Sequence, residues 1–86
     1  MRVALPTMLR SYTGGAAEVV ADGSTLAELL TDLDLKYPGI RFRVIDEQDR
    51  VRQHVRIFVD GEVARDLGVA LTPASAVQLV GALSGG

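Results

Sequence analysis

One amphipathic helix, flanked on both sides by strand-like segments, constrains the fold of this chain more than any other sequence feature. Residues 25–28 (TLAE) match a capping box, in which the Thr and Glu side chains each bond a backbone N–H at the start of a helix. Pro38-Gly39 ends the helix. A single apolar stripe predicts a helix that packs on a sheet rather than a docking face for a partner helix. The stripe consists of Leu26, Leu29, Leu30 and Leu33.

Two strand-like segments precede the helix and predict an antiparallel hairpin. Residues 3–9 have the pattern of a short strand, and Pro6 within it lacks an N–H, so we expect Pro6 at an unpaired edge or a bulge. Residues 10–15 are polar and end in Gly14-Gly15, which predicts a turn or loop. A phosphate cradle is disfavoured there because no Lys-Ser/Thr pair leads into a helix. Residues 16–21 form the second expected strand.

The segment after the helix predicts three more strands. Residues 39–53 have the weakest pattern, and we expect a short helical turn at most. Residues 54–59 alternate in the manner of a half-buried strand, and Asp60-Gly61 provides a two-residue hairpin turn before residues 62–65. A connection over residues 67–73 then leads to a final strand over residues 76–83.

This order of elements predicts an α+β fold. One helix after an initial hairpin, followed by three strands, describes a β-grasp (ubiquitin-like) domain, a mixed sheet of about five strands covered by one main helix. The 86 residues fit one domain, which we place at residues 1–83, followed by a flexible tail over residues 84–86. We expect the last strand to lie beside the first, with the tail exposed at its end.

Composition and charge exclude several classes of chemistry. The absence of cysteine excludes disulfides, thiolate metal sites and a cysteine nucleophile. His54 is the single histidine, so we predict no metal site or catalytic dyad and a solvated strand-end position. The net charge of −2 gives no general reason to expect nucleic acid, and no apolar run is long enough for a membrane span, so we expect a cytoplasmic protein.

The segment between the helix and the next strand contains the one local concentration of charged residues in the sequence. Asp46, Glu47 and Asp49 lack the spacing and central glycine of a calcium loop, which favours a solvated turn. Five arginines offer either an ordinary solvated surface or a docking surface for an acidic face or a phosphate. These are Arg41, Arg43, Arg50, Arg52 and Arg56.

The sequence ends in Ser84-Gly85-Gly86. Two glycines fit a slot in which any side chain would clash, and three extended residues carry a carboxylate about 10 Å beyond the fold. Such a tail is either a chemical handle for the active site of a partner or an inert frayed end.

Over nearly its whole length the chain resembles the ubiquitin-like sulfur-carrier proteins, the group that includes the small subunit of molybdopterin synthase and the thiamine sulfur carrier. Within that group it looks most like the actinobacterial cysteine-synthase sulfur carrier. The resemblance rests on PTMLR at residues 6–10, TGG at 13–15, TLAELL at 25–30, VRIFVDG at 55–61 and the final Gly85-Gly86.

The resemblance implies an ATP-dependent cycle rather than an enzyme. An activating enzyme would adenylate the carboxylate of Gly86, a sulfur donor would convert it to a thiocarboxylate, and a biosynthetic enzyme would accept the sulfur. The carrier would bind no cofactor itself, because ATP and the sulfur donor are used by the activating partner. Gly85 and Ser84 would thread the tail into the partner.

Residues 80–84 (VGALS) depart from the proline-containing segment that the family usually places before the glycine pair. Leu79 and Leu83 are therefore either apolar contacts with the partner or core residues, and Arg56 is a candidate docking residue. Three alternatives remain open at this point: the small subunit of molybdopterin synthase, a ubiquitin-like modifier joined to lysines through Gly86, and a β-grasp interaction module with an inert tail.

Overall fold

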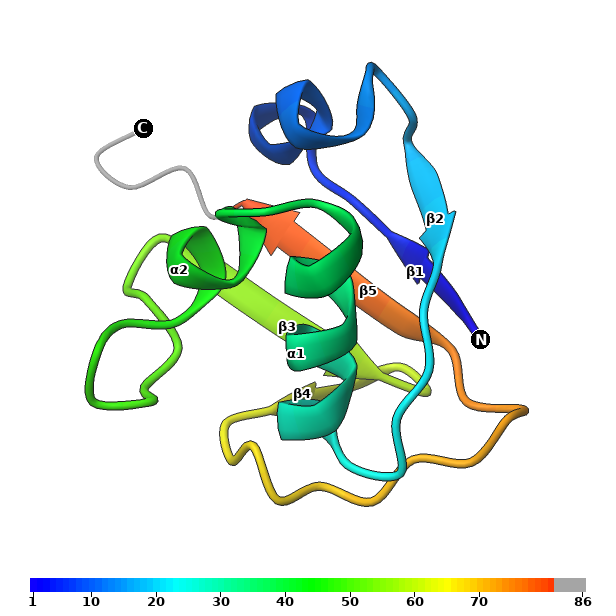
Figure 1. The fold of residues 1–86 in the computed structure, drawn as a ribbon. Coiled ribbons are helices and arrows are strands. Elements are labelled where there is room, and N and C mark those ends of the chain that lie inside the picture. The colour runs from blue at the N-terminus through cyan, green and yellow to red at the C-terminus, as the bar shows by residue number, and fades with distance from the viewer. Residues whose placement is uncertain (82–86) are drawn as a thin grey trace.

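Five strands form one mixed sheet in the order β2-β1-β5-β3-β4, as seen in the computed structural model, which describes residues 1–81 (Figure 1). Strand β5 pairs in parallel with β1 and antiparallel with β3, so it lies at the centre of the sheet. Strands β1 and β2 form the expected antiparallel hairpin. The strands are β1 (Arg2–Ala4), β2 (Glu18–Val20), β3 (Val55–Val59), β4 (Glu62–Ala64) and β5 (Val77–Gly81).

Helix α1 (Leu26–Lys36) covers one face of this sheet (Figure 1). All four leucines of the predicted stripe are fully buried. The Thr25 hydroxyl caps the helix by accepting from the Glu28 N–H at 3.3 Å. The Glu28 carboxylate forms the other half of the capping box, because it accepts from the backbone N–H of Ser24 at 2.9 Å. It also accepts from the Ser24 hydroxyl at 2.6 Å.

The first strand is shorter than the sequence predicted. It ends at Ala4, and a 3₁₀ helix, η1 (Thr7–Thr13), occupies most of the segment expected to be strand and loop. Pro6 is the N-cap of η1 rather than an edge or bulge residue, since its carbonyl accepts from the Leu9 N–H at 3.0 Å. Burial of Leu9 against the core offsets the loss of strand pairing.

A short helix, α2 (Ile40–Val44), forms in the weakly patterned segment and confirms the expected helical turn. Ile40 and Val44 anchor it in the core. The acidic triplet that follows forms a solvated turn, in which the Asp46 carboxylate accepts from the backbone N–H groups of Gln48 and Arg50 at 2.8 and 3.0 Å.

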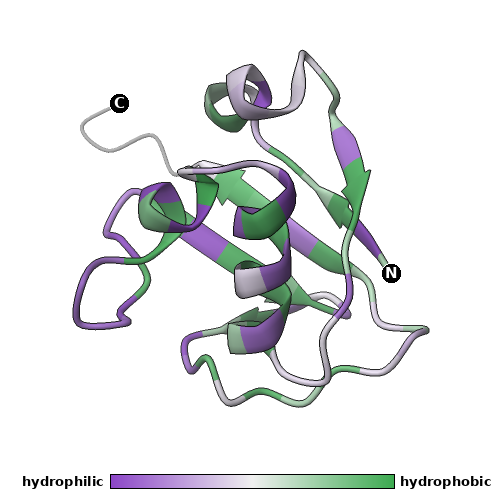
Figure 2. Ribbon diagram, in the orientation of Figure 1, coloured by the Kyte–Doolittle hydropathy of each residue, from purple (hydrophilic) through white to green (hydrophobic). Residues whose placement is uncertain are grey.

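The hairpin between β3 and β4 agrees with the sequence. Asp60 and Gly61 both have positive φ, 51° and 85°, which matches the twist of the flanking strands. Val55, Ile57 and Val59 face the core, and polar residues lie among the apolar ones along the strands (Figure 2). The structure confirms the α+β fold with a five-strand mixed sheet and one main helix.

Candidate functional site

The central strand β5 determines where the chain leaves the sheet. Its last residue, Gly81, is also the last residue that the structure describes. Gly81 pairs with β3, whereas the pairing of β5 with β1 ends at Gln78, so the end of β5 extends beyond β1 within the sheet (Figure 1). Ser84, Gly85 and Gly86, together with Leu83, lie outside the described residues.

Strand β3 provides one wall of this end of the sheet. Gly81 pairs with Val55, and Val80 pairs with Arg56. Arg56 is exposed, and its Nη1 donates to the carbonyls of Gln53 and Val55 at 2.9 and 3.0 Å, so its guanidinium folds back toward the start of β3. The candidate docking residue Arg56 therefore lies beside the last described residues of the chain.

The segment that begins η1 provides the opposite wall. A side chain at position 81 would meet the Sδ of Met8 at 3.4 Å and the Cβ of Pro6 at 3.7 Å, which places both residues against Gly81. Met8 is 38% exposed despite its apolar character. A groove of about 750 Å³ runs between this segment and Val80. Arg10 ties the segment to the sheet, since its Nη2 and Nε donate to the Leu5 carbonyl at 3.2 and 3.4 Å.

Sequence reasoning did not assign Pro6 and Met8 to the site. The only sequence signal was their place in the PTMLR segment, and periodicity suggested a strand there. Their approach to Gly81 depends on the parallel pairing of β1 with β5, which joins the two ends of the chain.

Leu79 requires a correction. Its side chain is 2% exposed and belongs to the core, so it is not an apolar contact available to a partner. The reason is the alternation of β5, in which Val77 and Leu79 face helix α1 while Gln78 faces the open side of the sheet. Of the two alternatives for Leu79, the core alternative is confirmed.

The five arginines of the basic cluster form two groups. Arg41 pairs with Asp49 at 3.1 Å and Arg50 with Asp46 at 3.9 Å, so both are partly neutralised. Arg52 stacks on the Phe42 ring at 4.7 Å from its centroid, and its Nε donates to the Phe42 carbonyl at 2.6 Å. A hollow of about 240 Å³ is lined by Phe42, Arg43, Arg52 and His54.

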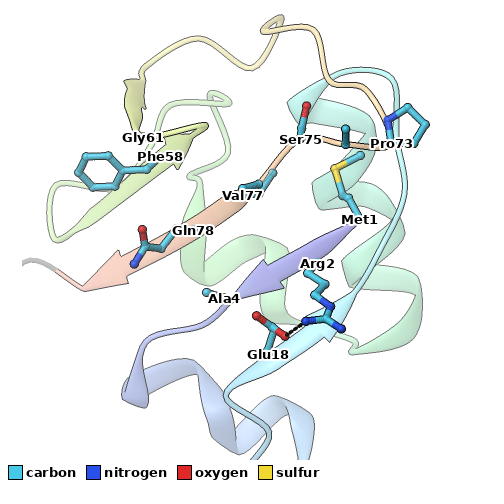
Figure 3. Close-up of a pocket in the computed structure, with 12 residues that line it drawn as sticks. Met1, Arg2, Ala4, Glu18, Phe58, Gly61, Pro73, Ser75, Val77 and Gln78 are labelled. Carbon is cyan, nitrogen blue, oxygen red and sulfur yellow. Dashed lines mark ion pairs between the residues drawn. The ribbon is translucent and has the colours of Figure 1, made fainter.

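A second hollow, of about 510 Å³, lies on the open face over the start of β5 (Figure 3). Gln78 and Phe58 line it from neighbouring strands, and Arg2 pairs with Glu18 at 3.6 Å. Its one arginine therefore has a carboxylate partner, in contrast to Arg52 and Arg56 near Gly81.

Several carboxylates have a lowered pKa because they accept hydrogen bonds that hold the local fold. The Ser24 hydroxyl and N–H lower the pKa of Glu28, and the Asp22 N–H, followed by Lys36, lowers the pKa of Asp32. The pKa of Asp46 is lowered mainly by the Arg50 N–H. None of these groups lines the groove beside Gly81.

Within residues 1–81 no group of three His, Asp or Glu side chains is placed to hold a metal ion. The same residues include no helix of the length and apolar character that crossing a bilayer requires.

Comparison with known proteins gives relatives over the full domain. The sulfur carrier protein CysO of Mycobacterium tuberculosis is 36% identical over 89 residues, which cover 98% of this chain and 96% of that protein. The crystal structure of M. tuberculosis CysO superposes with a TM-score of 0.89 at 32% identity, covering 95% of this chain and 98% of the other.

Two further structures have the same fold. The Amycolatopsis orientalis BexX/CysO complex contains a chain with a TM-score of 0.89 and 27% identity, covering 99% of this chain and 98% of that one. The crystal structure of SAMP1 from Haloferax volcanii has a TM-score of 0.77 and 27% identity, covering 100% of this chain and 98% of that one. The model of the ThiS family matches residues 3–86, which include the glycine pair. The chain therefore belongs to the ThiS family of ubiquitin-like β-grasp proteins.

Proposed function

We propose that this protein is a sulfur carrier whose Gly86 carboxylate carries sulfur to an enzyme of cysteine synthesis or of a related sulfur-containing metabolite. One observation carries the proposal: the ThiS-family match runs through Gly86, and a relative of nearly equal length is a sulfur carrier. The placement of Gly81 at the end of the central strand supports it, because the segment that follows starts from a rigid position.

The proposed chemistry has two steps. The Gly86 carboxylate oxygen attacks the α-phosphorus of ATP, which forms an acyl-adenylate and releases pyrophosphate. Hydrosulfide then attacks the acyl carbon, the acyl–oxygen bond breaks and AMP leaves, and loss of the sulfur-bound proton gives the thiocarboxylate. Adenylation is needed because a carboxylate oxygen is a poor leaving group.

Apart from the Gly86 carboxylate, which is the reacting group, the carrier contributes no general acid or base to these steps. ATP and the sulfur donor are used by an activating enzyme, and the product is used by a sulfur-accepting enzyme, so this chain acts as a protein co-substrate. We place this ATP-dependent cycle in the cytoplasm. The BexX/CysO complex supports the expectation of an enzyme partner, because a relative of this chain has been crystallised with a second protein.

A ubiquitin-like modifier is the second candidate. The likeness to SAMP1, a small archaeal modifier protein, favours it over the small subunit of molybdopterin synthase and over an inert interaction module. The same acyl-adenylate would then be attacked by a lysine amine of a target instead of by sulfur.

Pyrophosphate exchange tests the first step. An activating enzyme from the same cell is incubated with labelled pyrophosphate, ATP and the full chain, and a variant that lacks Gly86 is the matched control. We expect label to enter ATP only with the full chain. Equal exchange with both chains, or none with an enzyme that is active on its own carrier, contradicts the proposal.

A further inference from the structure

The strand end that presents Gly81 has an uncompensated positive charge at its side. We use the name exit rim for Arg43, Arg52, His54 and Arg56. None of the carboxylate side chains of residues 1–81 lies within the 4.0 Å ion-pair distance of any of these four residues. All eleven Asp and Glu residues of the chain fall in that range. The positive charge of the rim arginines is therefore not neutralised by a direct partner.

Within residues 1–81, two of the rim arginines, Arg52 and Arg56, donate to backbone carbonyls and not to carboxylates. The side chain of Arg52 is fixed by the Phe42 carbonyl and ring, and that of Arg56 by the carbonyls of Gln53 and Val55. These contacts orient the guanidinium groups and leave their charge intact. Asp46 acts on Arg52 only as a longer-range charge and makes its closest ion pair with Arg50.

Strand register places two residues of the rim, His54 and Arg56, beside the end of β5. His54 immediately precedes Val55, the partner of Gly81, and Arg56 pairs with Val80. Paired residues in adjacent strands have Cα atoms about 5 Å apart. Five residues follow Gly81, and an extended chain of that length spans at most about 17 Å. A partner that acts on the carboxylate of Gly86 must therefore bring its surface close to the rim.

We propose that the exit rim docks on a carboxylate-rich surface of the activating enzyme, around the slot that receives the tail. This inference rests on the proposed function and names the chemistry of the partner. The protein as a whole carries a net charge of −2, so an acidic partner is attracted by this local surface and not by the total charge. Screening confines such an attraction to about 8 Å at physiological salt, which matches a surface close to the tail.

A matched pair of double variants tests the proposal. Arg43→Gln/Arg56→Gln removes two rim charges and leaves Arg52 in place. Arg2→Gln/Arg50→Gln removes two charges that have carboxylate partners, from side chains that are 80% and 72% exposed. Both variants lose the same formal charge, and urea unfolding verifies that both remain folded.

The readout is the KM of the activating enzyme for the carrier in pyrophosphate exchange, as a function of salt. We expect the rim variant to raise KM about five- to tenfold at low salt, with the difference shrinking to within about twofold near 0.5 M salt. The control variant should stay within about twofold of the wild type.

Three results would overturn the inference. Equal effects of both double variants would indicate net charge rather than the rim. An effect of the rim variant that does not depend on salt would exclude charge pairing. A lower KM in the rim variant would indicate that the rim holds the chain's own carboxylate. In each case exchange with the wild-type chain still occurs, which separates failure of this inference from failure of the proposed function.

Discussion

Val55 and Gly81 face each other in the β3–β5 ladder, so the last described residue of the chain is held by the central strands of the sheet. On its other side, Gly81 lies against Met8 and Pro6. The end of β5 is therefore held on one side by β3 and on the other by the segment that begins η1.

Leu79→Ala tests the assignment of Leu79 to the core. Because the side chain is 2% exposed, we expect the variant to lower the free energy of unfolding by about 2–5 kcal/mol, measured by urea unfolding. Gln78→Ala, at the exposed neighbouring position, should change it by less than about 0.5 kcal/mol. A stable Leu79→Ala protein with a raised KM for its activating enzyme would instead favour a partner contact.

Gly23→Ala tests the close approach of the chain to the start of helix α1. A Cβ at this position would lie 2.5 Å from the Leu29 nitrogen and 2.8 Å from the Glu28 carbonyl carbon, both backbone atoms. We expect a loss of about 1–3 kcal/mol in the free energy of unfolding.

Gly81→Ala is the matched control for Gly23→Ala. Its Cβ would meet only side-chain atoms, at 3.4 Å or more, so we expect unchanged or slightly higher stability. An equal loss in the free energy of unfolding for the two variants would contradict the closer backbone packing around Gly23.

Acid should destabilise the fold through Glu28, Asp32 and Asp46. Hydrogen bonds lower the folded-state pKa of these groups from ordinary values of 4.5, 3.8 and 3.8. The unfolded state therefore binds more protons, and the stabilisation, complete above about pH 5.5, is lost as pH falls through the folded-state values.

Urea unfolding of wild type and Glu28→Gln between about pH 7 and pH 3 checks this expectation. The variant should lose less stability on acidification, because the Glu28 carboxylate no longer titrates. Glu47→Gln is the control, since the exposed Glu47 carboxylate accepts no hydrogen bond within residues 1–81. Identical pH profiles for wild type and Glu28→Gln would contradict the role of the Ser24 contacts.

Lys36 distinguishes the sulfur carrier from the modifier. It is the only lysine in the chain, and its Nζ lies 3.1 Å from both the Asp32 carboxylate and the Val20 carbonyl. The amine of Met1 bonds to Ala21 and Asp22. Both amines are held by oxygen atoms of the chain itself, so activation without a sulfur donor should give no linked copies on a denaturing gel.

A ladder of linked copies that disappears in Lys36→Arg would contradict this expectation and favour the modifier. Arg65→Lys is a control that preserves charge. It adds an amine at an exposed position, and capture of the activated tail by this variant alone would show that the tail is reactive and that Lys36 is protected.

Local patterns predicted the elements that depend on neighbouring residues. The leucine stripe and the Thr25 cap identified α1, and Asp60-Gly61 identified the β3–β4 hairpin, because spacing and φ preference act within a few residues. The prediction of Pro6 in a strand was wrong, because Pro6 begins the 3₁₀ helix η1, which brings Leu9 into the core. That contact is made with residues distant in the sequence.

The site was less accessible to sequence reasoning. Gly85 and Gly86 are a prediction from the sequence and lie outside the described residues, whereas the groove beside Met8 required the parallel pairing of β1 and β5. Only the structure separates the arginines that have a carboxylate partner from those that do not, as the ion pair between Arg41 on α2 and Asp49 in the next loop illustrates. Pairing between distant segments has no signature in local periodicity.

The most direct test of the central claim is the intact mass of the chain after incubation with ATP, a sulfide source and its activating enzyme. We expect a gain equal to the exchange of one oxygen for one sulfur, absent from a variant that lacks Gly86 and lost again when the sulfur-accepting enzyme is added. An unchanged mass, with an enzyme that forms the thiocarboxylate of its own established carrier, would contradict the sulfur-carrier account.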